Sequence, residues 1–425
     1  MNHASRLTNI LQQFSILLIV GVFAGVAVAN LDDSFYQQLV EHQVFGAHAT
    51  VFGHHLTARF LINQVFMVFF FGIAAKEITE SVLPGGALNP ASKAINPLLA
   101  TLGGILGPVG LYFLLAFIFY GGSDDFSVVA NGWGIPTATD IALAWLVARL
   151  VFGNGHPAVN FLLLLAVADD AIGLGIIAVF YSDPDHPVNP QWLLLTLGGM
   201  AAAFGMRRLH VRYWPWYIVI GGGMSWVGLL KSSIEPALAL VVIVPFLPGP
   251  RLDPGLFAEE ADSDPALQQT RPAADVSEHG HSPLEQFESH LKLIVDMGLF
   301  FFAFANAGVA FGSVNSVTFI VLLSLLAGKM VGISTFSWVG SYLGFPLPTG
   351  MQAKHLVVAG MIAGLGLTVA LFVATKAFAG PATSREAAFL DPAKMGALLS
   401  GGIALLALAA GAVLHLKDGP GAERD

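Results

Sequence analysis

Residues 161–180 read FLLLLAVADDAIGLGIIAVF, and this stretch decides the fold. Its only charged residues are Asp169 and Asp170, which lie at its centre. An apolar run of about 20 residues is long enough for a helix that crosses a bilayer. Because an ionisable group inside hydrocarbon costs several kcal/mol, two adjacent carboxylates in such a helix indicate a functional site rather than packing.

The composition of the whole chain also indicates a membrane protein. Charged residues make up 11% of the 425 residues, hydrophobic residues make up 55%, and the mean hydropathy is +0.71. A soluble domain carries about 25% charged residues. The net charge of −9 offers no basic face for nucleic acid. The chain has no cysteine, which excludes disulfides, thiolate metal sites, iron–sulfur clusters and cysteine nucleophiles.

Similar apolar runs recur along almost the whole chain, separated by short segments that contain Gly, Pro and Asp. This pattern predicts an all-α polytopic membrane protein with about twelve transmembrane helices. The predicted spans are residues 12–30, 58–83, 93–120, 134–150, 155–181, 190–206, 213–227, 229–247, 285–311, 317–341, 353–378 and 393–416.

One segment differs in character and divides the chain. Residues 248–284 are rich in Asp, Glu, Pro and Ser, which predicts an acidic, disordered cytoplasmic linker. Spans 1–8 (1–247) precede it, and spans 9–12 with a short tail (285–425) follow it. The linker is either a plain tether or a partner-binding segment. The distribution of Lys and Arg between the loops, twelve against four, favours both termini in the cytoplasm.

The geometry of a helix constrains what Asp169 and Asp170 can do. Neighbouring residues point about 100° apart, so the two carboxylates cannot share one proton as a protease dyad does. One can meet a basic partner on another helix while the other faces an aqueous cavity. Carboxylate oxygens suit a hard cation such as sodium, and protons could compete with sodium for them.

A second charge in an apolar run is Lys329, within VLLSLLAGKMVGISTFSWVG (321–340). A buried ammonium needs an anion, and an intramembrane aspartate is the obvious one. We therefore predict an ion pair between Lys329 and either Asp169 or Asp170. The alternative is a lysine whose side chain reaches the membrane interface.

Two glycine-rich segments predict interrupted helices. The segment GWGIPTATD (132–140) contains Pro136 and ends in Thr139 and Asp140, and GMIAGLGLT (360–368) matches it in the other half of the chain. Pro removes a backbone donor and Gly weakens a helix. Asp140 could neutralise the positive ends of the half-helices, and Thr139 offers a hydroxyl ligand. The pairing predicts an inverted repeat of spans 3–5 onto spans 10–12, with discontinuous helices 4 and 11 crossing at the midplane.

Six motifs together give the chain a resemblance to the NhaA-type sodium/proton antiporters, over roughly residues 60–416. They are GIPTATDIA (134–142), AVADDAIG (166–173), VGLLKSS (227–233), FAFANAGV (302–309), AGKMVGIS (327–334) and GLGLTVALF (364–372).

The resemblance implies a role for each matching residue. Asp170 would be the principal sodium and proton carboxylate, Asp169 would pair with Lys329, and Asp140 and Thr139 would compensate charge where the broken helices cross. It further implies electrogenic, alternating-access export of sodium (or lithium) in exchange for protons, serving pH and sodium homeostasis. The family uses no cofactor or ATP, is not an enzyme, has no transition-metal site, forms homodimers and resides in the bacterial inner membrane.

Several positions depart from the family pattern. Ala74 stands where the family's GLEVK motif has its glutamate, Glu77 follows Lys76 where the family has a basic residue, and Glu235 replaces a histidine after the LKS motif. The family's pH profile therefore cannot be carried over. Asp296 in HLKLIVDMGLFF is a further unexpected acid, either for proton entry or at a wet interface. Glu235 and Asp296 are thus weaker candidates for the site.

Two other functions remain open from the sequence. An intramembrane aspartyl protease also needs two membrane aspartates, but on separate helices with one in a Gly-x-Gly-Asp setting, which this chain lacks. A sodium-coupled organic anion transporter of the same fold needs no intramembrane lysine paired with an aspartate. Lys329 therefore argues against that cargo.

Overall fold

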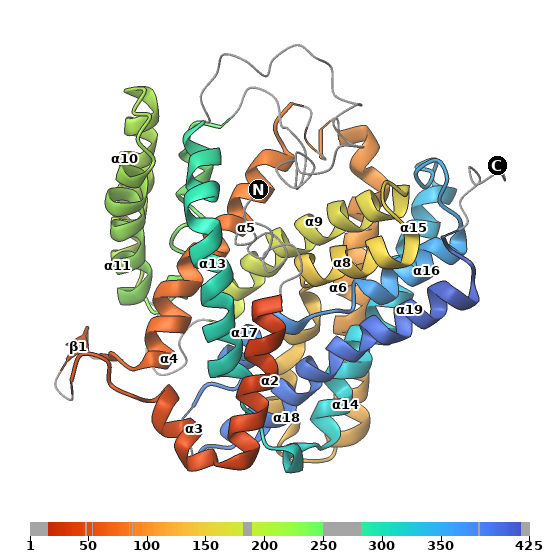
Figure 1. Cartoon of the computed structure of the whole chain (residues 1–425), viewed down its shortest axis with the longest axis horizontal. Helices are drawn as coiled ribbons and strands as arrows, with labels where there is room; N and C mark the ends of the chain where they lie inside the picture. Colours follow the sequence, from red (N-terminus) through yellow and green to blue (C-terminus); the bar gives the residue numbers. More distant parts are fainter. Residues whose placement is uncertain are drawn as a thin grey trace, which may run out of the picture. The chain divides into compact units, whose positions relative to one another are not determined.

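The computed structural model describes residues 16–46, 49–52, 54–84, 86, 88–89, 91–181, 189–249, 282–380 and 383–417 (Figure 1). These residues are almost entirely helical. The exception is a short antiparallel hairpin, β1 (Thr50–Val51) and β2 (His54–His55), in which Thr50 pairs with His55. The predicted linker lies mostly at residues 250–281, outside the described residues.

Six helices among the described residues are long and apolar enough to cross a membrane, which makes the chain a helical membrane protein. Three of them contain a local change of helix type, described below. The six are Ala58–Ser81, Ala94–Tyr120 within α6 (Ala91–Tyr120), Pro157–Phe180 (α9), Pro283–Ala307 (α13), Ser316–Tyr342 and Ala387–Val413.

Two further spans are broken, which raises the number in the described residues to eight. The first consists of α7 (Phe126–Ala130) and η2 (Asn131–Thr137), followed by α8 (Ile141–Phe152) at a bend of 54°. The second joins α16 (Ala353–Ile362) to α17 (Leu367–Ala377) at a bend of 50°. Both breaks lie in the Gly-rich segments where the sequence predicts an interruption, because Pro136 lacks a backbone donor and the glycines weaken the helix.

Three of the spans change helix type along their length. Ala58–Ser81 is α4 (Ala58–Leu61), the π-helix η1 (Ile62–Phe66) and α5 (Met67–Ser81). Ser316–Tyr342 is α14 (Ser316–Leu323), the π-helix η9 (Ser324–Gly328) and α15 (Lys329–Tyr342). Ala387–Val413 is α18 (Ala387–Leu399), the 3-10 turn η10 (Ser400–Gly402) and α19 (Ile403–Val413). The remaining elements are α2 (Ile16–Leu31), α3 (Asp33–Val40), η3 (Pro190–Trp192), α10 (Leu193–Arg208), η4 (Tyr217–Gly222), α11 (Gly223–Lys231), η5 (Pro236–Leu238), η6 (Val244–Phe246) and η8 (Phe311–Ser313).

The prediction of two spans at 213–227 and 229–247 is wrong. One continuous helix, η4 with α11, runs from Tyr217 to Lys231 and crosses the predicted boundary. Residues after it form consecutive turns with the two short 3-10 segments η5 and η6. The helix stops because Ser233 adopts a positive φ of 63° and Pro236 cannot donate a backbone hydrogen bond.

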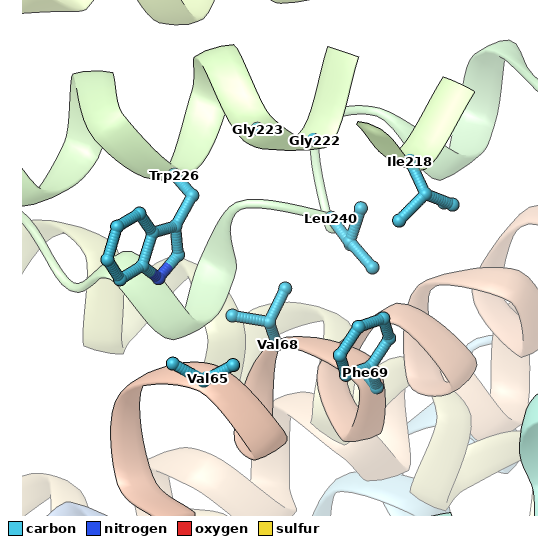
Figure 2. A pocket seen from close by; sticks show the side chains of 8 residues that line it. All are labelled: Val65, Val68, Phe69, Ile218, Gly222, Gly223, Trp226 and Leu240. Carbon is cyan, nitrogen blue, oxygen red and sulfur yellow. The ribbon is translucent and has the colours of Figure 1, made fainter. Parts of the chain in front are cut away.

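The described chain packs as two compact units. The first includes Gln64–Ala94 and Val188–Gly298, and the second includes Phe14–Asn63, Ile95–Pro187 and Leu299–Asp425. In the first unit, residues of η1, α5, η4, α11 and the segment before η6 line an open apolar pocket of ≈ 250 Å³ (Figure 2). The division of the chain at residues 1–247, 248–284 and 285–425 stays a prediction.

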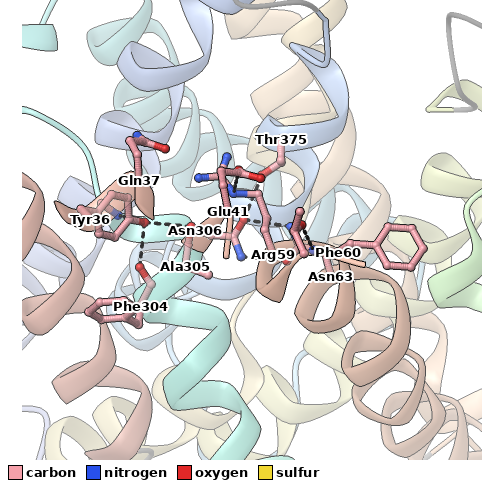
Figure 3. Close-up of polar contacts among 12 residues, drawn as sticks. Tyr36, Gln37, Glu41, Arg59, Phe60, Asn63, Phe304, Ala305, Asn306 and Thr375 are labelled. Atoms are coloured by element: carbon pink, nitrogen blue, oxygen red, sulfur yellow. Dashed lines mark hydrogen bonds and ion pairs between the residues drawn. The ribbon is translucent and has the colours of Figure 1, made fainter. Parts of the chain in front are cut away.

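Hydrogen bonds among polar groups join several elements of the second unit. Asn63 Nδ2 donates to Asn306 Oδ1 at 3.2 Å, and Asn306 Nδ2 donates to Asn63 Oδ1 at 2.9 Å (Figure 3). Tyr36 donates its hydroxyl to the carbonyl oxygens of Phe304 and Ala305, each at 2.8 Å. Because a buried polar group without a partner is costly, these bonds fix η1 and α3 against the end of α13.

Glycines allow α6 and the η9–α15 helix of the second unit to touch. Gly103 and Gly107 on α6 face Gly328 and Gly332, and both pairs have the spacing that lets membrane helices approach closely. A Cβ atom added at Gly103 would overlap the carbonyl oxygen of Gly332. This contact holds the beginning of α15, and therefore Lys329, against α6.

We expect Gly103→Ala to destabilise the protein by about 1–3 kcal/mol, because the added methyl group must separate two backbones in contact. Gly110→Ala, on the same helix, is the matched control, since its Cβ would meet no atom within 4 Å. Thermal unfolding of the two purified variants checks the prediction. Equal melting temperatures would show that the contact is not tight.

Candidate ion-binding site

Asp169 and Asp170 lie in the middle of α9. The helix begins sharply because His156 caps it and Pro157 occupies its first turn. The Asp169 side chain is buried, with 1% of the residue exposed. The two side chains leave the helix in different directions, as the spacing predicts, and have different surroundings.

Asp169 lies beside Lys329, the first residue of α15. The Lys329 ammonium donates to Asp169 Oδ2 and, at 2.7 Å, to the hydroxyl of Thr139. Lys329 is fully buried, so the ion pair is screened from water. The ammonium therefore contacts one opposite charge, Asp169, and has two oxygen acceptors in all. A buried charge requires such a counter-charge and hydrogen-bond partners.

Thr139 connects this ion pair to the second broken span. Its hydroxyl oxygen lies 2.8 Å from Asp169 Oδ2 and 2.8 Å from the carbonyl oxygen of Ala363, between α16 and α17. A hydroxyl has one proton to donate, so Thr139 can satisfy only one of these two acceptors at a time. Its hydrogen bond can therefore switch when the charge on Asp169 changes.

Asp140 joins the two breaks to each other. Its Oδ1 accepts the backbone N–H of Leu143 at 3.1 Å and caps α8, and its Oδ2 accepts the hydroxyl of Thr368 at 2.9 Å. The Asp140 N–H donates to the carbonyl oxygen of Leu365 at 2.6 Å. Thr368 is in the first turn of α17, so one carboxylate lies at the positive ends of two half-helices.

Asp170 differs from the other two acids. Its Oδ1 is buried and has no hydrogen-bond partner among the residues that the structure describes. Asp169 Oδ1 has no partner there either, but the other oxygen of Asp169 is held by Lys329 and Thr139, and neither of these side chains bonds to Asp170. A buried carboxylate oxygen without a donor is costly when ionised, so a proton or a cation would stabilise it. Asp170 therefore has a buried carboxylate oxygen that neither Lys329 nor Thr139 satisfies.

Two predicted residues belong to the other unit. Glu235 is buried, caps η5 and accepts the backbone N–H of Ala237 at 3.3 Å. Asp296 is half-buried on α13. Both lie in the first unit, whereas Asp140, Asp169 and Lys329 lie in the second. Five of the seven candidate residues therefore lie in the second unit: Thr139, Asp140, Asp169, Asp170 and Lys329.

Sequence reasoning missed a second group of charges, in the first unit. The buried ammonium of Lys76 on α5 contacts three carboxylates: Glu80 at 2.7 Å, Glu77 at 3.3 Å, and Glu288 on α13. The spacing of four residues between Lys76 and Glu80 on a helix could have indicated the first contact. No pattern in the sequence indicates Glu288, which is more than 200 residues away.

The chain matches the family model described as Na+/H+ antiporter 1 over residues 6–414. A relative from Geobacter sulfurreducens named Na(+)/H(+) antiporter NhaA is 52% identical over 410 residues, covering 96% of this chain and 98% of the relative. Na(+)/H(+) antiporter NhaA 1 from Pelobacter propionicus is 52% identical over 97% of this chain and 99% of its own length. A relative from Desulfitobacterium hafniense is 49% identical over 98% of both chains. With both the model and these relatives covering nearly its whole length, the chain belongs to the Na+/H+ antiporter 1 family.

Proposed function

We propose that this chain exchanges sodium ions for protons across a bacterial membrane, with Asp170 as the principal carboxylate. The observation that carries the proposal is the pair of buried oxygens, Asp170 Oδ1 and Asp169 Oδ1, that have no donor among the described residues. Carboxylate oxygens are suitable ligands for a hard cation, and a proton satisfies them equally well. Binding of one ion then displaces the other.

The surrounding residues support this exchange. While no cation is bound at Asp170, the Lys329 ammonium neutralises the charge of Asp169. The hydroxyl oxygen of Thr139 accepts a hydrogen bond from the same ammonium at 2.7 Å. When a cation binds at Asp170, its positive charge competes with the Lys329 ammonium for the negative charge of the neighbouring Asp169. Asp140 holds the two broken spans together through Thr368 and Leu365. A change of charge at Asp169 can thus reach both breaks through Thr139.

We further infer the finer architecture that the family resemblance implies. The broken spans are the fourth and eleventh of about twelve membrane segments, are related by an inverted repeat and cross at the midplane. Transport proceeds by alternating access, is electrogenic and uses neither ATP nor another cofactor. The protein works as a homodimer in the inner membrane with both termini in the cytoplasm. Lithium is a second substrate.

Proton flux in everted membrane vesicles tests the proposal. The vesicles are energised to form a proton gradient, which a fluorescent probe reports across a pH series. We expect sodium or lithium to dissipate the gradient and choline, the matched control, to leave it intact. A faster response when potassium and valinomycin clamp the membrane potential would support electrogenic exchange. No response to sodium or lithium at any pH would contradict the proposal and favour an organic anion as the cargo.

A further inference from the structure

Three aromatic rings meet where α8 ends and where α9 and α16 begin. Phe152 is the last residue of α8, His156 caps α9, and His355 is in the first turn of α16. The two imidazole centroids are 4.7 Å apart, and the Phe152 ring lies 5.6 Å from His156 and 6.1 Å from His355. The rings therefore join the ends of three helices in the second unit.

Hydrogen bonds define the protonation state of both imidazoles. His156 Nδ1 accepts the backbone N–H of Ala158 at 3.1 Å, and His355 Nδ1 accepts the backbone N–H of Gln352 at 3.0 Å. A nitrogen that accepts a hydrogen bond carries no proton, so each neutral ring has its proton on Nε2. Protonation of Nδ1 would remove the acceptor and leave a helix N–H without its cap.

The electrostatic surroundings also favour two neutral rings. Both imidazoles lie at the positive N-terminal ends of helices, where an added positive charge is unfavourable. The helices α8, α9 and α16 that carry or adjoin the rings contact one another, and α19 contacts both α8 and α16. The charged or titratable groups near these helix ends are Arg149 on α8, Lys354 on α16, and His415 and Lys417 in the residues that follow α19, where the carbonyl oxygen of Leu414 accepts from Lys354. The carboxylates on these elements are distant in sequence: Asp140 caps the opposite end of α8, and Asp169 is about 20 Å further along the axis of α9.

Burial also favours the neutral form of His156, which precedes the membrane span. It lowers the pKa of His156 from the ordinary value of 6.5. A lowered folded-state pKa means that the unfolded chain binds the proton more readily. This contribution to stability is therefore complete above a pH of about 6.5 and is lost as the pH falls towards the folded-state pKa.

We propose that His156 and His355 are positioning residues for the exchange: as two neutral imidazoles in contact, with their planes tilted by 53°, they tie the first turn of α9 to the first turn of α16. Helix α9 carries Asp169 and Asp170, and α16 leads to Ala363, whose carbonyl oxygen meets Thr139. Protonation of either ring breaks a cap, places a positive charge at the positive end of a helix and releases the tie. The role in transport rests on the proposed function, whereas the tie between the helices does not.

Substitutions that keep the caps but remove the titration test this proposal. His156→Asn places a strong capping residue at the start of α9, and His355→Gln keeps an acceptor in the first turn of α16. With each flux profile normalised to its own maximum, we expect the double variant to move the acid limb to lower pH by about half a unit. His156→Ala, which has neither cap nor charge, should instead lower flux at every pH. His210→Asn is the matched control, because His210 is exposed and its φ of 57° suits asparagine.

Thermal unfolding gives a second readout that does not require transport. We expect the wild-type melting temperature to fall between about pH 8 and pH 5, and the fall to be smaller in the double variant. Acid limbs and melting temperatures identical to those of the wild type would overturn the proposal. Absence of sodium-dependent flux in every variant, wild type included, would refute the proposed function. The melting series would then still decide whether the imidazole pair ties the two helices.

Discussion

Replacing Asp170 with asparagine should reduce sodium-dependent proton flux in everted vesicles to the level of vesicles without the protein. The buried Oδ1 of Asp170 has no donor among the described residues, so the carboxylate can accept either a proton or a cation. An amide of the same shape carries no negative charge and has no proton to exchange in this range of pH. Binding and release should therefore both fail, although the fold remains.

Two comparisons make this result specific. Asp124→Asn is the matched control, because Asp124 is exposed between α6 and α7 and the same chemical change there should leave the flux unchanged. Asp170→Glu keeps the charge but displaces the oxygens, so we expect partial flux with weaker sodium dependence. Size-exclusion profiles confirm that each variant is folded. Undiminished flux in Asp170→Asn would rule out Asp170 as the exchanging carboxylate.

Removing the ammonium of Lys329 should have the largest effect on stability. Lys329→Ala leaves the Asp169 carboxylate buried without its counter-charge, in a position where 1% of Asp169 is exposed. Breaking a buried ion pair in this way costs about 3–5 kcal/mol. We therefore expect a much lower melting temperature for the purified variant than for the wild type.

The comparison variants separate lost charge from lost packing. Leu405→Ala truncates a side chain of which 71% is exposed on α19, and it should change the melting temperature little. Lys329→Met combined with Asp169→Asn removes both charges, and should recover much of the stability that Lys329→Met alone loses. Equal melting temperatures for Lys329→Ala and Leu405→Ala would show that the contact between Lys329 and Asp169 does not stabilise the protein.

The residues that could be identified from sequence are those whose charge is unfavourable in hydrocarbon. Asp169, Asp170 and Lys329 are each isolated in an apolar run, so their presence alone indicates a function. Asp140 and Thr139 were found because Gly and Pro interrupt the helix beside them. In the structure these five residues lie in one unit, around the two breaks.

Contacts made by uncharged groups could not be identified in the same way. The carbonyl oxygen of Ala363 and the hydroxyl of Thr368 complete the site, but backbone carbonyls occur at every residue and threonines are common in helices. His156 and His355 were missed because a histidine at the start of a helix has no distinctive sequence pattern. Their approach depends on how α8, α9 and α16 pack, which is a tertiary property.

The error at residues 213–247 has a different physical origin. An apolar segment containing Pro236 and Pro245 has the composition of a span, but it lacks the backbone donors needed for an uninterrupted helix. Hydropathy measures how readily a segment enters hydrocarbon, and it is insensitive to whether the backbone can form regular hydrogen bonds. Helix η4–α11 also passes through Gly221, Gly222 and Gly223, where the sequence does not reveal a change to π-helix.

The π-helical turn at Ser324–Gly328 has a consequence for how the chain can tolerate insertions and deletions. A π-turn accommodates one more residue than an α-helical turn, so the faces of α14 and α15 are out of phase by about 100°. Loss of a single residue from this turn would let the helix become regular at little local cost. It would also rotate the Lys329 side chain away from Asp169 while α14 kept its packing. The length of this turn therefore sets the direction of the buried ammonium, and an insertion or deletion here is more harmful than most substitutions.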